Sequence, residues 1–218
     1  MELIKIENLS LEVSKQKILD DINFSIHKGQ FTSINGPSGS GKSTILRILA
    51  RLTKESSGNI YFEDKDMYQY EYTDYRKEVS YVIQNPQLFG ETIRDNLSFP
   101  AKVRNQEFDE NRAKSLLDRL GLGHMNLDKS VYSLSGGEKQ RIGLIRNLMY
   151  PPKELLLDEV TSSLDDDSSE LVWDFLFEEA KKSEITLVWV SHDEHEQNMA
   201  EQKIYLKKGK MAKGEMNE

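Results

Sequence analysis

The chain has 218 residues, a formal net charge of −8 and no cysteine. This length suits one large α/β domain or two small ones. An acidic chain without a basic block is poorly suited to binding nucleic acid, because that binding depends on neutralising phosphates. The absence of cysteine excludes a disulfide framework and a thiolate metal site, and it is compatible with the cytosol.

The sequence carries no sign of a membrane helix or a signal peptide. No apolar stretch approaches the roughly 20 residues that a membrane helix needs. Residues Met1–Lys5 alternate like a strand. The polar segment Lys208–Glu218 is expected to form a short strand and a frayed tail.

Short alternating or apolar segments in the first half of the chain predict β-strands. A helix is predicted to begin near Lys42, because apolar residues then recur on one broad helical face. The tyrosine-rich segment Glu63–Glu78 is predicted to be a surface loop and turn that its tyrosines partly cover, with a binding surface as the alternative. The predicted strands are Leu3–Leu9, Ile22–Ile26, Phe31–Asn35, Asn59–Phe62 and Val79–Ile83.

From about residue 91 to residue 148 the apolar residues recur at helical spacing, which indicates a helical insert. A strand (Glu154–Leu157), a helix (Glu170–Lys181) and a strand (Ile185–Val190) then follow. Strands that alternate with helices predict a parallel, doubly wound sheet. The expected fold class is therefore α/β, with a helical subdomain inserted into the core.

The segment Gly36–Ser43 fits the phosphate-loop pattern G-x-x-x-x-G-K-[ST] and lies between a predicted strand and a predicted helix. Glycines let backbone N–H groups turn toward phosphate oxygens, and the helix N-terminus adds partial positive charge. Lys42 is expected to reach the β- and γ-phosphates, and the Ser43 hydroxyl to ligate Mg²⁺. A glycine-rich turn is the alternative. The expected nucleotide-binding residues are Gly36, Pro37, Ser38, Gly39, Ser40, Gly41, Lys42, Ser43 and Thr44.

Two acids follow the apolar run Leu155–Leu157. Such runs are typical of interior strands of parallel sheets, and ligands bind at the carboxyl ends of those strands. Asp158 is expected to hold Mg²⁺, directly or through water. Glu159 is expected to orient or deprotonate an attacking water. An acidic loop without function is the alternative.

The segment Leu134–Glu138 reads Leu-Ser-Gly-Gly-Glu. Ser135 and Glu138 form the S-x-x-E pattern of a capping box. A capping box does not explain Gly136 and Gly137, since each glycine costs up to about 1 kcal/mol relative to alanine in a helix interior. A phosphate that approaches the helix N-terminus would explain both glycines.

Three motifs, in this order along the chain, resemble those of the ABC ATPases. They are the phosphate loop, the Leu134–Glu138 segment and the Leu157–Glu159 run. The Leu-Ser-Gly-Gly element is the specific one, because many phosphate-loop NTPases carry the other two. The resemblance covers essentially the whole chain. It implies ATP and Mg²⁺ as cofactors, and a head-to-tail dimer with a second copy. In that dimer Ser135, Gly136 and Gly137 of one copy contribute to the nucleotide site of the other.

The resemblance also implies a single ABC ATPase domain over residues 1–218. Residues 1–90 and 150–218 would form a phosphate-loop NTPase core with a mostly parallel sheet and an N-terminal antiparallel β portion. Residues from about 91 to 149 would form the inserted helical subdomain that carries the Leu-Ser-Gly-Gly-Glu signature.

Two loop positions match further family residues. Gln84, at the end of the strand Val79–Ile83, matches the glutamine that senses Mg²⁺ and the attacking water. The segment Ser163–Asp165 matches the loop that crosses the dimer interface. The next two acids, Asp166 and Asp167, are expected to stabilise the following helix N-terminus rather than to bind metal.

His192 follows the strand Ile185–Val190 and matches the switch histidine that contacts the γ-phosphate. Its H-x-x-H spacing with His195 gives metal binding as the weaker alternative. One position departs from the family, which stacks an aromatic residue on adenine near the position of Val13. No aromatic residue lies between Leu3 and Asn23 in this chain.

Further segments resemble those of the bacterial FetA (YbbL) subfamily. They are Gln84–Thr92, Asp95–Pro100 and Gly137–Leu148, the last with Asn147. That resemblance implies an integral-membrane permease as partner, a link to iron export, and a position in the cytoplasm on the inner face of the cell membrane. Leu88 and Phe89, in a predicted surface loop, would contribute to a groove for the permease, with packing into the subdomain core as the alternative.

Three other functions compete with this interpretation. An ABC importer would use the same ATPase motifs. A soluble ABC ATPase that acts on nucleic acid or ribosomes usually carries long coiled coils or two ATPase halves, and this chain has one set of motifs and no heptad tract. A small-molecule kinase with a phosphate loop would not need the Ser-Gly-Gly segment.

Overall fold

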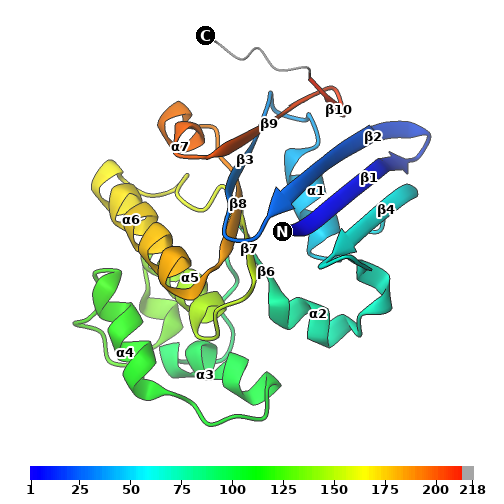
Figure 1. The fold of residues 1–218 in the computed structure, drawn as a ribbon. Helices are drawn as coiled ribbons and strands as arrows, with labels where there is room; N and C mark the ends of the chain where they lie inside the picture. Colours follow the sequence, from blue (N-terminus) through cyan, green and yellow to red (C-terminus); the bar gives the residue numbers. More distant parts are fainter. Residues whose placement is uncertain (213–218) are drawn as a thin grey trace. The chain divides into compact units, whose positions relative to one another are not determined.

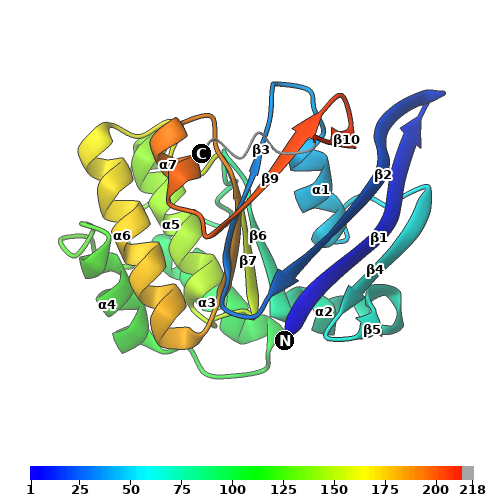
Figure 2. The same cartoon turned by 45° about the horizontal axis from the view of Figure 1, so that its top comes forward.

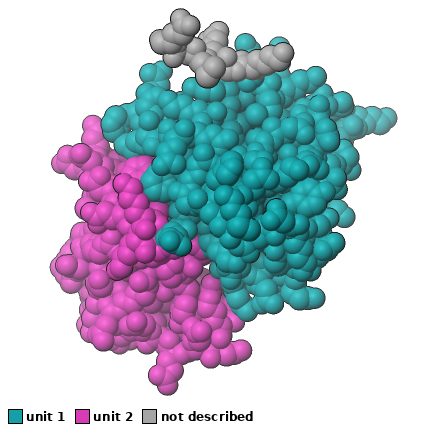
Figure 3. Space-filling model, viewed as in Figure 1, with its two compact units in different colours: residues 1–81, 153–159, 184–218 teal, residues 82–152, 160–183 magenta. Residues whose placement is uncertain are grey.

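A computed structural model describes residues 1–212 of the chain. The described residues form two compact units, coloured separately in Figure 3. Unit 1 comprises residues 1–81 and 153–159 and, within the described part, residues 184–212. Unit 2 comprises residues 82–152 and 160–183, so the predicted helical subdomain of residues 91–149 falls inside it.

Unit 1 contains a four-stranded antiparallel portion in the order β2-β1-β4-β5. Its strands are β1 (Glu2–Val13), β2 (Gln16–His27), β4 (Ser57–Phe62) and β5 (Lys65–Asp66). The first two are longer than the predicted segments, because the alternation of buried and exposed residues continues toward the hairpin turn. This confirms the predicted N-terminal antiparallel portion.

A second sheet has the order β10-β9-β3-β8-β7-β6, and its neighbours β9-β3, β3-β8 and β8-β7 are parallel. All residues of the two central strands β3 and β8 are buried, as expected for the interior of a parallel sheet. Figure 2 shows this sheet beside the helix α1 (Lys42–Leu49), with the antiparallel strands on the other side of that helix. The strands are β3 (Phe31–Asn35), β6 (Val79–Val82), β7 (Glu154–Asp158), β8 (Thr186–Val190), β9 (Gln202–Lys207) and β10 (Lys210–Met211).

The core of unit 1 forms where the apolar face of α1 packs between the two sheets. The predicted face of this helix, with Ile45, Leu46, Ile48 and Leu49, has no exposed surface. The same cluster contains Leu156 of β7 and apolar residues of β1, β4 and β9. The predicted α/β class is confirmed. The short strand predicted after Lys208 is β10, and the remainder of the predicted tail, residues 213–218, lies outside the described residues.

The tyrosine-rich segment differs from the predicted loop. It forms a 3-10 helix (Met67–Gln69) and the helix α2 (Tyr72–Glu78). Tyr75 is fully buried, its hydroxyl donates to the Leu49 carbonyl at 2.7 Å, and its ring meets Phe62 edge to face at 5.4 Å between centroids. The prediction that the tyrosines only cover a surface loop is therefore wrong for Tyr75.

Unit 2 is helical, as predicted, and Figure 1 shows its helices in green to orange. They are α3 (Ile93–Val103), α4 (Glu110–Arg119), α5 (Gly136–Leu148) and α6 (Asp166–Ser183). The helix α6 begins before the predicted Glu170, and the acids Asp166 and Asp167 lie in its first turn, where a helix favours negative charge.

An ion-pair cluster around one buried carboxylate joins three helices of unit 2. Glu179 of α6, whose side chain is 1% exposed, pairs with Arg112 at 2.9 Å and Arg119 at 2.5 Å, both from α4. Arg112 also donates to the Leu148 carbonyl at 2.7 Å and thereby caps the C-terminus of α5. The cluster holds α5, which carries the Ser-Gly-Gly segment at its other end.

No helix within residues 1–212 has both the length and the apolar character needed to span a bilayer.

Candidate nucleotide-binding site

The phosphate loop joins the carboxyl end of β3 to the first residue of α1. Gly36 has a φ of 137°, and a Cβ there would clash with the Leu206 carbonyl of β9. Gly41, the residue before α1, has a φ of 103°, and a Cβ there would lie 2.6 Å from the Leu19 side chain. Both positions therefore require glycine, which explains the two glycines of the motif.

Lys42 is 6% exposed, and its ammonium folds back across the loop. It donates to the carbonyl oxygens of Gly36 at 2.9 Å and Pro37 at 3.2 Å. Burial lowers the pKa of Lys42, while the negative charges of Glu159 and Asp158 act in the opposite direction. A phosphate in the loop would offer this ammonium anionic oxygens in place of neutral carbonyls.

Asp158 and Ser43 lie together, as the sequence predicted for two ligands of one metal ion. The Ser43 hydroxyl, in the first turn of α1, donates to Oδ1 of Asp158 at 2.8 Å. The second oxygen of Asp158 accepts a 2.6 Å hydrogen bond from the Tyr81 hydroxyl. A hydroxyl and a carboxylate are hard oxygen donors, and Mg²⁺ uses one or two such protein groups together with phosphates. The residues present therefore fit Mg²⁺.

Sequence reasoning missed Tyr81. Burial, and then the hydrogen bond to Asp158, raise the pKa of Tyr81 well above its ordinary value, so the phenol stays protonated and donates. A tyrosine inside a predicted strand is more often packing than function, and its partner is 77 positions away along the chain. Local pattern could not have shown the contact.

Glu159 and His192 lie side by side, from the ends of β7 and β8. The His192 Nε2 is 3.0 Å from Oε1 of Glu159. Glu159 has a φ of 51°, and its N–H donates to the Val190 carbonyl at 3.0 Å, which holds this unusual backbone conformation. Backbone strain of this kind is concentrated at functional sites. The pair suits a carboxylate that orients a water beside a phosphate-sensing imidazole.

A cavity of about 330 Å³ in unit 1 is lined by Lys42, Ser43, Glu159 and His192, among others. Of the predicted site residues, the structure brings together the loop residues Ser38 to Thr44 with Glu159 and His192. Within residues 1–212, no group of three or more His, Asp or Glu side chains could hold a metal ion.

No Phe, Tyr or Trp is among the described residues that line this cavity. Val13, where the family places its adenine-stacking ring, ends β1 with 52% exposure and does not line the cavity. From the β1–β2 hairpin, Ile18 of β2 lines the cavity instead. The sequence could not distinguish Val13 from Ile18, because only the folded hairpin shows which residue faces the phosphate loop.

In unit 2 the capping box predicted at the start of α5 is formed. Ser135 accepts from the Glu138 N–H at 3.2 Å, and Glu138 accepts from the Ser135 N–H at 2.6 Å. A Cβ placed on Gly136 would meet no atom of the described residues within 4 Å, so packing within that part of the chain does not require glycine there. Gly137 is different, since a Cβ there would lie 3.0 Å from the Leu164 side chain.

Gln84 and Asp165 also belong to unit 2. The Gln84 amide donates to the Ser162 hydroxyl at 3.0 Å. Asp165 accepts from the N–H and hydroxyl of Ser168 at 2.9 and 3.1 Å and so caps α6. This cap is a structural role that the sequence analysis did not assign to Asp165.

A profile of the ABC transporter family matches residues 19–162. The chain is 44% identical to the probable iron export ATP-binding protein FetA of Escherichia coli (strain K12), over 94% of this chain and 91% of that protein. It is 38% identical to the probable sulfate/thiosulfate import ATP-binding protein CysA of Chlorella vulgaris, over 95% and 89% of the two chains.

Among solved structures, a dimeric ATP-binding cassette in a post-hydrolysis state, bound to ADP and Pi, matches with a TM-score of 0.86. The two chains are 28% identical over 95% of this chain and 96% of that one. The geometry of the phosphate loop and its carboxylates agrees with these likenesses. The chain belongs to the ABC transporter family as an ATP-binding ATPase cassette.

Proposed function

We propose that this chain is the ATPase subunit of an ABC transporter and that it energises a separate membrane permease from the cytoplasmic face of the membrane. The observation that carries the catalytic part is the grouping of Lys42, Glu159 and His192 at one cavity, beside the Ser43–Asp158 pair. Each of these groups has a defined task in phosphoryl transfer to water.

In this proposal Lys42 and the loop N–H groups bind the β- and γ-phosphates. Ser43 and Asp158 hold Mg²⁺, which neutralises charge on the phosphate oxygens when bound. Glu159 orients the attacking water and receives its proton, and His192 contacts the γ-phosphate. Gln84 senses the ion and the water.

The second half of the site comes from another copy of the chain. Ser135, Gly136, Gly137 and Asp165 would act on the nucleotide that the partner copy binds. Two observations support this: the N-terminus of α5 is capped by Ser135, and Gly136 is open where a side chain would fit. A phosphate that must approach the backbone closely accounts for that glycine.

The permease would dock on exposed apolar groups of unit 2. Phe89 is 40% exposed and Phe99 is 45% exposed, and their ring centroids lie 4.9 Å apart, edge to face. The Arg146 guanidinium lies 5.3 Å from the centre of the Phe89 ring. An aromatic anchor of this kind is a typical interface hot spot.

The likeness to the iron export protein favours export of iron or another metal ion as the transported cargo. Import is the second candidate, because the chain is also similar to an import ATPase. The test is transport in sealed vesicles that contain a candidate partner permease, with this subunit and ATP added on the outside. Export predicts that metal moves away from the ATPase side, and import predicts the opposite direction. Lys42→Ala must abolish either movement.

A further inference from the structure

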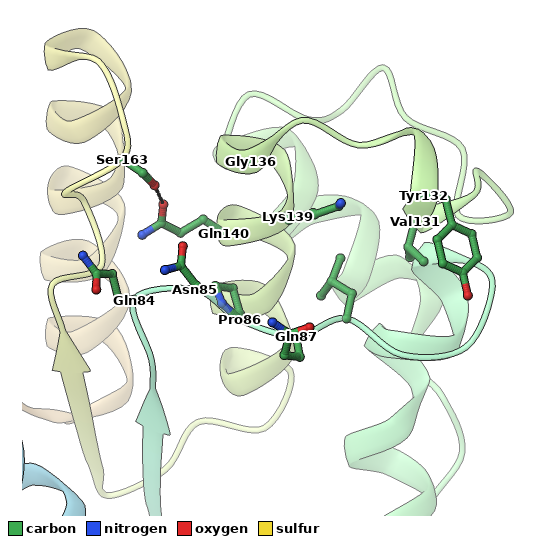
Figure 4. A pocket seen from close by; sticks show the side chains of 11 residues that line it. Gln84, Asn85, Pro86, Gln87, Val131, Tyr132, Gly136, Lys139, Gln140 and Ser163 are labelled. Atoms are coloured by element: carbon green, nitrogen blue, oxygen red, sulfur yellow. Dashed lines mark hydrogen bonds between the residues drawn. The ribbon is translucent and has the colours of Figure 1, made fainter.

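The loop Val160–Asp165 is tied to the helix that carries the Ser-Gly-Gly segment. The Ser163 hydroxyl donates to Oε1 of Gln140 on α5 at 2.5 Å, the contact drawn as a dashed line in Figure 4. The amide nitrogen of the same Gln140 donates to the Val160 carbonyl. One side chain of α5 therefore holds the loop at two points, three residues apart.

Gln140 is buried and links the loop to α5. It is 3% exposed, and both ends of its amide are used by this loop. It lies five residues after Ser135, less than two turns from the N-terminus of α5. Because a helix is stiff over this length, a displacement of the loop at Gln140 also displaces that N-terminus.

A packing contact lies alongside the two hydrogen bonds. The Leu164 side chain sits against Gly137, where even a Cβ would approach to 3.0 Å. The loop also accepts a hydrogen bond from the Gln84 side-chain amide, through the Ser162 hydroxyl at 3.0 Å. The loop thus contacts, within unit 2, both the glutamine at the end of β6 and the N-terminal half of α5.

We infer that Ser163 and Gln140 are positioning residues that join the Val160–Asp165 loop and the Ser135–Gly137 segment into one body. The two elements would then engage the partner's nucleotide site together rather than independently. The inference rests on the proposed site shared between two copies. A hydroxyl at position 163 is the specific requirement, since an alanine side chain has no donor for Oε1 of Gln140.

The competing explanation is that Gln140 only fills space in unit 2. That role predicts loss of stability when the contact is removed, with no selective effect on pairing of two copies. The positioning role predicts the reverse, because Ser163 is itself exposed and contributes little buried area. The two explanations differ in which measurement changes.

The experiment uses the full chain with Glu159→Gln, which slows hydrolysis so that Mg-ATP persists. Ser163→Ala, Ser163→Thr and the control Ser115→Ala, at an exposed serine of α4, are added singly. Three quantities are measured: the dissociation constant of the ATP-dependent dimer by sedimentation, the binding of a fluorescent ATP analogue to dilute monomer, and the melting temperature.

Ser163→Ala is expected to weaken the dimer by about 2- to 10-fold, the equivalent of one net hydrogen bond, because the loop and the Ser135–Gly137 segment are no longer joined. Since Ser163 is exposed, water can replace its hydroxyl in the monomer. Monomer nucleotide binding and melting temperature should stay at the parent values, and Ser163→Thr and Ser115→Ala should dimerise like the parent. Two results overturn this inference and leave the shared site standing. One is a dimer dissociation constant that is unchanged in Ser163→Ala. The other is a melting temperature that falls in proportion to the loss of dimer affinity. A parent protein that never dimerises with Mg-ATP overturns the shared site and this inference with it.

Discussion

The Tyr81 hydroxyl donates a 2.6 Å hydrogen bond to Oδ2 of Asp158, while Oδ1 of the same carboxylate accepts from Ser43. Tyr81 thus restrains the carboxylate to which the proposed function assigns Mg²⁺. Groups that orient a metal ligand typically account for 10- to 100-fold in metal affinity.

Tyr81→Phe removes only this hydroxyl, and it should raise the Mg²⁺ concentration needed for half-maximal ATPase activity by about 10-fold. A magnesium titration of the steady-state rate gives the value. Tyr61→Phe, at a partly exposed tyrosine of β4, is the matched control and should leave the titration unchanged. An identical magnesium titration in Tyr81→Phe and wild type would show that Ser43 alone orients the carboxylate.

The cavity wall at Ile18 predicts weak selection of the base. An aliphatic side chain neither hydrogen-bonds to the edge of a purine nor stacks on its ring as an aromatic does. The dissociation constants of ATP and GTP should therefore lie within about 10-fold of each other. Ile18→Tyr supplies a ring and should increase ATP affinity by roughly 2- to 10-fold, the equivalent of an aromatic pair. Competition against a fluorescent ATP analogue measures both. A preference for ATP above 100-fold in the wild type would mean that another group recognises adenine.

Glu154, the first residue of β7, is fully buried, and neither oxygen of its carboxyl group has a hydrogen-bond partner among residues 1–212. Burial raises the pKa of Glu154 to about 8 from its ordinary 4.5. Between these values the folded chain holds a proton that the unfolded chain has lost. The free energy of unfolding should therefore fall as the pH rises through this window and level off above it.

Glu154→Leu should remove this pH dependence and stabilise the protein at pH 7 by up to about 3 kcal/mol. Urea denaturation at pH 5 and pH 8 provides the comparison, and the gain should be larger at pH 8. Glu170→Gln, at an exposed position of α6, controls for the loss of charge. Equal stabilisation at both pH values would contradict a buried carboxyl group that titrates in this range.

Phe89 should be required for docking of the permease but not for folding. It keeps 40% of its surface exposed, so Phe89→Ala should change the melting temperature by no more than a few degrees. Recovery of the permease with tagged subunit should fall by at least 10-fold, the loss of a hot spot of about 2 kcal/mol. Leu52→Ala, at an exposed leucine of unit 1, is the control. An unfolded Phe89→Ala protein would mean that the residue belongs to the core.

Local patterns predicted the parts of this protein whose chemistry is contiguous. The strand Phe31–Asn35, the glycine loop and the helix from Lys42 follow one another in the sequence, and each imposes its own conformation. The capping box of Ser135 and Glu138 is likewise local.

Contacts between distant segments could not be predicted in this way. Tyr81 meets Asp158 across 77 positions, and Tyr75 becomes core only because its helix packs against Leu49 and Phe62. The Ser163–Gln140 hydrogen bond spans 23 positions, and neither segment by itself indicates that the two side chains meet. Their positions depend on how strands and helices pack, which alternation and spacing do not specify.

The central claim is that two copies of this chain share each ATP and that Glu159 directs its hydrolysis. Sedimentation of Glu159→Gln with saturating Mg-ATP tests it most directly, with the steady-state ATPase rate measured on the same sample. The rate should fall by about 10²- to 10⁴-fold, because a general base is lost, while ATP still binds. The protein should then sediment as a monomer without nucleotide and as a dimer with Mg-ATP. A variant that binds Mg-ATP at saturation and remains strictly monomeric would contradict the claim.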